Sequence, residues 1–129
     1  MSDVPATSLD AERTYDEARF STSEVFRSDR AKVVCGYFEP GQFIPVHAPE
    51  SDVTITVQSG TGTVREGDTE HAVAPGDVVV ADAGTERGVK ADDDARLEAV
   101  LVTAPPPTDA EHDPVREGIR RDEFDPTNK

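Results

Sequence analysis

The sequence contains little of what several classes of protein depend on. Cysteine occurs once, at Cys35, tryptophan is absent, and aromatic residues make up 5% of the chain. A single cysteine excludes an internal disulfide and favours a reducing compartment. No apolar run is long enough for a membrane-spanning helix, and the acidic start MSDVPATSLD lacks the basic-then-apolar pattern of a signal peptide. We therefore expect a cytoplasmic protein.

Basic residues are also scarce, with 13 Lys and Arg against 27 Asp and Glu and a formal net charge of −14. Nucleic acids and anionic membranes attract concentrated basic residues, so neither is an expected partner. The acidic residues are spread over the whole chain, as in halophilic proteins that stay soluble in brine. We expect such an acidic protein to unfold at low ionic strength. The length of 129 residues fits one domain.

The middle of the chain consists of short β-type runs separated by Gly, Pro and Asp. In one run Val53, Ile55 and Val57 alternate with polar residues, which is typical of a strand with one buried face. Close strands with tight turns favour an all-β antiparallel sandwich or barrel over alternating β-α units. The last run is apolar at less regular intervals, which predicts a strand covered on both faces. The runs are Ala31–Glu39, Val53–Ser59, Thr63–Glu66, Thr69–Val73, Val78–Ala81, Gly88–Lys90 and Leu97–Thr103.

The segments before and after this region have different sequence patterns. We expect helical character around Ala11–Arg19 and an edge strand at Ser23–Arg27. The prolines at 105–107 end the last strand, because proline cannot donate to a sheet ladder. Asp113 followed by Pro114 predicts the start of a short helix that runs to about Arg121. The expected division is an N-terminal extension (1–21), a β-barrel domain (22–104) and a C-terminal extension (105–129).

Two stretches, Gly41–Gly60 and Gly76–Ala91, resemble the paired motifs of the cupin superfamily, which are small jelly-roll β-barrels. The resemblance covers about residues 31–103 and implies a cupin-like jelly-roll β-barrel, or double-stranded β-helix. Tight turns between barrel strands need positive φ angles, which glycine adopts readily. Glycines occupy the matching turn positions, at Gly41, Gly60, Gly76 and Gly84.

In metal-binding members of this superfamily, three His and one Glu hold a divalent metal inside the barrel. The four corresponding positions in this chain are His47, Pro49, Val53 and Arg87. Metal sites generally need three protein ligands, so one imidazole predicts that the metal site is degraded and that no cofactor is bound.

A rearranged divalent metal site is an alternative, in which Glu50 or Asp52 and His71 join His47. Period-2 alternation opposes it at Asp52, which faces outward if Val53 faces inward. His71 is expected on a solvent-facing strand. Cys35 is either a soft ligand or, as free cysteines usually are, a small buried hydrophobe.

Arg87 is the most informative of these residues, because it places a fixed cation where the resemblance implies a ligand directed into the barrel. A guanidinium repels a divalent metal and favours a carboxylate or phosphate. The first hypothesis is therefore that Arg87, His47 and Glu50 bind a small polar or anionic molecule at the barrel mouth. The structural alternative is that Arg87 pairs with an internal acid such as Glu39 or Glu50.

Two further hypotheses stay open. The chain could resemble the metal-dependent cupin enzymes (isomerase, dioxygenase or decarboxylase) with His47 as a metal ligand or general base, although no other catalytic residue is identified. It could also be a structural or interaction protein. By resemblance to small cupins we expect a homodimer, with Ser23–Arg27 near its interface. His112 lies in the polar tail and is expected to be solvated.

Overall fold

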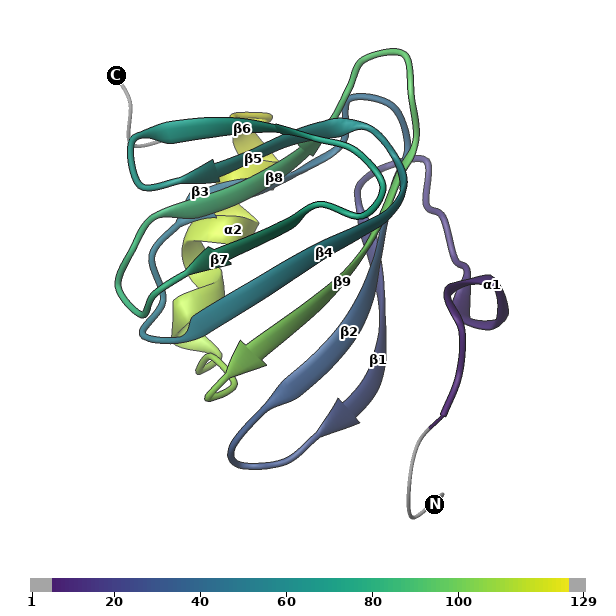
Figure 1. Cartoon of the computed structure of the whole chain (residues 1–129). Helices are drawn as coiled ribbons and strands as arrows, with labels where there is room; N and C mark the ends of the chain where they lie inside the picture. The colour runs from purple at the N-terminus through teal and green to yellow at the C-terminus, as the bar shows by residue number, and fades with distance from the viewer. Residues whose placement is uncertain (1–5, 126–129) are drawn as a thin grey trace.

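A computed structural model describes residues 6–125, in which nine strands form two antiparallel sheets that face each other (Figure 1). This arrangement confirms the all-β jelly-roll prediction. The five-stranded sheet has the order β1-β2-β9-β4-β7, and the four-stranded sheet has the order β3-β8-β5-β6. The first sheet contains β1 (Ser21–Arg27), β2 (Lys32–Phe38), β9 (Leu97–Ala104), β4 (Asp52–Gly60) and β7 (Val78–Ala81). The second contains β3 (Phe43–His47), β8 (Arg87–Ala91), β5 (Gly62–Glu66) and β6 (Thr69–Val73).

The core lies between the two sheets and is built mainly from aliphatic side chains, together with the fully buried Phe38. In β4 the side chains of Val53, Ile55 and Val57 are buried, as the alternation predicts. In β9 both Leu97 and its neighbour Glu98 are buried, which confirms that this strand is covered on both faces. Each fully buried aliphatic side chain stabilises the fold by about 1.5–3 kcal/mol.

Strand β3 was not among the predicted β-type runs, because Pro45 lies in its middle. Proline has no N–H to donate to a ladder and is tolerated only where that donor is not needed. In this fold β3 is an edge strand, and its register with β8 is irregular between Ile44 and His47. The edge is satisfied from outside the sheet, since the Val46 N–H donates to the carbonyl oxygen of Phe124 at 2.7 Å.

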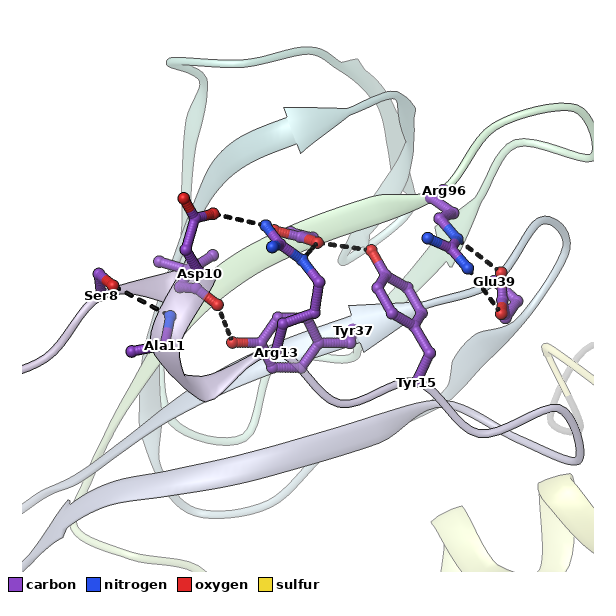
Figure 2. Close-up of polar contacts among 10 residues, drawn as sticks. Ser8, Asp10, Ala11, Arg13, Tyr15, Tyr37, Glu39 and Arg96 are labelled. Atoms are coloured by element: carbon purple, nitrogen blue, oxygen red, sulfur yellow. Dashed lines mark hydrogen bonds and ion pairs between the residues drawn. The ribbon is translucent and has the colours of Figure 1, made fainter.

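The predicted helical character around Ala11–Arg19 is confirmed only at residues 11 and 12, and residues 13–19 are not helical. Helix α1 spans Leu9–Glu12, with Ser8 as its N-cap, and Arg13 leaves the helical conformation. The following residues instead contact the outer face of the five-stranded sheet. Figure 2 shows Arg13 and Tyr15 reaching inward from this segment, and both donate hydrogen bonds to the carboxylate of Glu98. Tertiary contacts therefore override the local helical tendency.

The C-terminal segment folds back onto the barrel. After the 3₁₀ turn η1 (Ala110–His112), helix α2 (Asp113–Arg121) packs against β3 and confirms the predicted helix. The approach is close, since a Cβ on Gly118 would lie 2.5 Å from Cβ of Pro45. The predicted edge strand is also confirmed, as β1.

The described residues contain no helix long and apolar enough to cross a membrane. Residues 1–5 and 126–129 of the two predicted extensions lie outside the described residues.

Candidate functional site

A cavity of about 320 Å³ lies between the two sheets and receives side chains from both. Ile55 and Leu101 line it from the five-stranded sheet, and Val89 lines it from the four-stranded sheet. The flanks add further lining residues, among them Arg19 before β1 and Arg116 in α2. Because those two arginines are exposed, the lining extends from the surface to the barrel interior.

Arg87 is the most deeply buried cation of this lining, with 4% of its surface exposed. Its Nε and Nη2 atoms donate to the backbone oxygens of Thr85 and Asp82, each at 2.8 Å. Its Nη1 is buried and has no hydrogen-bond partner among the described residues. Burial lowers the pKa of the guanidinium, because desolvation disfavours the charged form, and the carboxylates of Asp52, Glu111 and Glu50 partly oppose this shift. An unpaired buried charge destabilises the fold, so this arrangement calls for an explanation.

The predicted structural partners of Arg87 do not provide that explanation. Glu39 pairs with Arg96 at 2.8 Å, and Glu50 is exposed, with its backbone N–H donating to Glu111. Within residues 6–125, Arg87 forms no ion pair with any carboxylate. The prediction that Arg87 pairs with Glu39 or Glu50 is therefore wrong.

His47 lies beside Arg87, as its partner in the register of β3 and β8. Its Nδ1 is 2.8 Å from the carbonyl oxygen of Pro45. Since a carbonyl only accepts, Nδ1 carries the proton, and in the neutral ring the lone pair is on Nε2. Burial lowers the pKa of His47, and the neighbouring Arg87 and His112 add to the shift. The ring is therefore neutral at neutral pH and lies beside Arg87.

His112 was predicted to be solvated, and this prediction is wrong. The residue is half-buried and lines the cavity, because α2 and η1 fold back onto the barrel. Burial lowers its pKa, and the cations Lys32 and Arg116 lower it further. Lys32 and Arg116 therefore lie close enough to His112 to disfavour its protonated form.

The charges of the lining differ sharply from those of the chain as a whole. Arg19, Lys32, Arg87 and Arg116 line the cavity, whereas the described residues contribute no Asp or Glu to it. Arg116 is paired with Asp109 and Asp113. Since the chain has more than twice as many acidic as basic residues, this lining differs in charge from the chain as a whole.

The donors present do not fit the divalent metal of the superfamily. Pro49, Val53 and Arg87 all line the cavity, and none of them can ligate a metal beside His47. Asp52 faces outward, as predicted, and accepts from the N–H of Ala83. Among residues 6–125 no three His, Cys, Asp or Glu side chains form a metal-binding group.

The remaining candidate donors lie outside the cavity lining. His71 in β6 is 3.2 Å from the carboxylate of Glu66. Cys35 is buried in β2, as predicted for a small hydrophobe, and its neighbour Val34 faces the cavity instead. Glu50 does not line the cavity either, so the structure brings together Arg87 and His47 of the three predicted ligand-binding residues.

The profile of the cupin domain family matches residues 36–103, more than half of the chain, and the chain therefore belongs to the cupin family. It is similar to the TT1209 protein from Thermus thermophilus, with 30% identity, a TM-score of 0.77, and coverage of 81% of this chain and 100% of that chain. It is also similar to an RmlC-like cupin protein from Desulfovibrio desulfuricans, with 31% identity and a TM-score of 0.70. That match covers 80% of this chain and 98% of the other. A conserved protein with a double-stranded β-helix domain from Klebsiella pneumoniae is 26% identical, with a TM-score of 0.72. That match covers 81% of this chain and 91% of the other. No curated protein sequence matches the chain.

Proposed function

We propose that this cupin binds a small anionic molecule in the barrel cavity without a metal, with Arg87 as the anchor and His47 beside it. The observation that carries the proposal is the buried guanidinium whose Nη1 has no partner among the described residues. A bound anion would give it a charge-assisted hydrogen bond and offset its desolvation. The acid-free lining favours the same ligand class.

The proposal is tested by calorimetric titration of the purified protein with acetate, benzoate and inorganic phosphate, with neutral benzamide as the uncharged comparison. We expect benzoate to bind and benzamide to bind at least tenfold more weakly, because hydrogen bonds to charged groups contribute about 1.5–3 kcal/mol. Arg87→Met should weaken benzoate binding by a similar factor.

Arg120→Met is the matched control, since Arg120 is an exposed arginine of α2 that does not line the cavity. It changes the net charge equally and should leave anion binding unchanged. Equal loss in both variants would contradict the role of Arg87. Stoichiometric Fe, Mn, Zn or Ni in protein purified without chelator would favour the metal-dependent alternative and contradict the proposal.

A further inference from the structure

The strands that form the cavity place several of its polar lining residues at one end. Lys32, Thr103 and Val53 are neighbours in register on the five-stranded sheet, and His47 and Arg87 are neighbours on the four-stranded sheet. All five line the cavity. Both rows lie where the connections 48–51 and 82–86 cross between the sheets. Lys32, Thr103, His47 and Arg87 therefore gather at this end of the barrel.

Two residues deeper along the strands the lining becomes apolar. Val34, Leu101 and Ile55 are in register on the five-stranded sheet, and Ile44 and Val89 are in register on the four-stranded sheet. Alternate residues of a strand face the same side and are about 7 Å apart. The cavity thus has a charged row and an apolar row, separated by roughly the length of a short alkyl chain. Beyond the apolar row, Thr22 and Arg19 line the cavity near the start of β1.

The unpartnered edge of Arg87 restricts the head group that would bind in the charged row. A guanidinium has five N–H donors, and the hydrogen bonds to Thr85 and Asp82 occupy two of them. The buried Nη1 atom is unpartnered among the described residues, and it lies beside Nη2 in the same plane. This edge matches the two coplanar oxygens of a carboxylate.

We propose that the ligand is a monocarboxylate with an apolar tail, which places its carboxylate on Arg87 and its tail between the two apolar rows. The inference rests on the proposed function and narrows its substrate class. The volume of about 320 Å³ is near the lower end of the 300–1,000 Å³ typical of small-molecule sites. The tail that fills it is therefore short to medium in length.

The test is a calorimetric titration with acetate, butyrate, hexanoate, octanoate and decanoate, each beside the alcohol of the same chain length, and with inorganic phosphate. We expect affinity to increase about fourfold per methylene, the equivalent of ~0.8 kcal/mol for each buried CH₂. The increase should end at or before octanoate, when the cavity is full. Each alcohol should bind at least tenfold more weakly than its carboxylate.

A pair of valine substitutions tests where the tail lies. Val34→Thr preserves the shape of the side chain and places a hydroxyl in the apolar row, which should weaken octanoate binding roughly tenfold and leave acetate unchanged. Val80→Thr is the control, since Val80 is 56% exposed on β7 and does not line the cavity. If both variants bind octanoate equally well, the tail does not contact Val34 and the inference is wrong.

The outcomes separate this inference from the proposed function. If acetate, octanoate and phosphate bind equally and all depend on Arg87, the anion site stands and the apolar-tail inference is overturned. If no carboxylate and no phosphate binds, both are overturned. If the alcohols bind as tightly as the carboxylates, Arg87 is not the anchor and both are again overturned.

Discussion

Two buried charges in this barrel have opposite surroundings. Glu98 in β9 is 5% exposed and Arg87 in β8 is 4% exposed. The Glu98 carboxylate accepts two hydrogen bonds from Arg13, at 2.6 and 3.0 Å, and one from the hydroxyl of Tyr15 at 2.7 Å. Figure 2 shows both donors directed from the N-terminal segment onto the sheet. Arg87 has two backbone carbonyls and one unpartnered nitrogen instead.

The difference shows what each charge contributes. The hydrogen bond from Arg13 lowers the pKa of Glu98, in spite of its burial, so the folded state favours its charged form. The pKa of Arg87 is lowered by burial, so the folded state disfavours its charged form. A buried charge whose hydrogen bonds are satisfied holds one segment against another. A buried charge with unsatisfied donors destabilises the fold, and under the proposed function a bound anion would satisfy them.

The largest expected effect comes from removing these two charges one at a time. Glu98→Gln should lower the free energy of unfolding by about 2 kcal/mol, because Arg13 and Tyr15 lose a charged acceptor. Arg87→Met should change it by less than ~1 kcal/mol, since the loss of two backbone contacts is offset by the removal of a buried charge. Urea unfolding followed by circular dichroism measures both.

Glu117→Gln is the control for the first variant, because Glu117 pairs with Arg120 and Arg121 on the helix surface. Surface pairs of this kind contribute little, so no measurable change in the urea midpoint is expected. A larger loss of stability in Arg87→Met than in Glu98→Gln would reverse the assignment of the two charges.

A carboxylate placed in the cavity should make the surroundings of Arg87 resemble those of Glu98. Val53 lines the cavity from β4, at the position where the superfamily has a glutamate. Val53→Glu is therefore expected to pair with Arg87 and to weaken benzoate binding at least tenfold. Val80→Glu adds the same charge on an exposed part of β7 and should leave binding unchanged, as calorimetric titration can determine. Unimpaired binding in Val53→Glu would mean that the anion site does not involve Arg87.

Much of the barrel was predictable because its determinants are local. The alternation of Val53, Ile55 and Val57 identifies the buried face of a strand without any knowledge of its neighbours. Gly60 is required at its turn, with a φ of 80° and a Cβ that would lie 1.7 Å from the carbonyl oxygen of Arg96. Strand β3 escaped prediction because Pro45 opposes it locally, and the Phe124 contact that satisfies its edge is distant in sequence.

The candidate site was predictable only in part. Arg87 and His47 lie at positions of a recognisable motif, so the resemblance places them inside the barrel. Lys32 and His112 line the cavity from outside residues 36–103, where the family profile matches. The fold-back of α2 depends on the contact between Gly118 and Pro45, which are far apart in the chain. No local pattern reports a contact of that kind.

The smallest expected effect is a difference in the pH at which the cavity histidines and Glu98 lose their contribution to stability. Burial lowers the pKa of His47 and of His112 below the ordinary value of 6.5, so the unfolded chain takes up these protons first. The free energy of unfolding should therefore begin to fall as the pH drops below about 6.5. Glu98, whose pKa is lowered from 4.5, contributes stability above pH 4.5 that is lost as the pH falls through its folded value.

Two variants distinguish the loss of stability below about pH 6.5 and the further loss below pH 4.5 from the titration of the other carboxylates. His47→Asn should reduce the loss of stability between pH 7.5 and 5.5, and Glu98→Gln should reduce the further loss below pH 4.5. Urea midpoints at pH 7.5, 5.5 and 4.0 measure both differences against the wild type. Octanoate should also reduce the loss of stability between pH 7.5 and 5.5 in the wild type, because a carboxylate on Arg87 favours the protonated form of the adjacent imidazole. Octanoate could instead reduce the loss of stability between pH 7.5 and 5.5 equally in Arg87→Met. The protonation of the cavity histidines would then not depend on an anion held by Arg87, and the contrast between Arg87 and Glu98 would not involve anion binding.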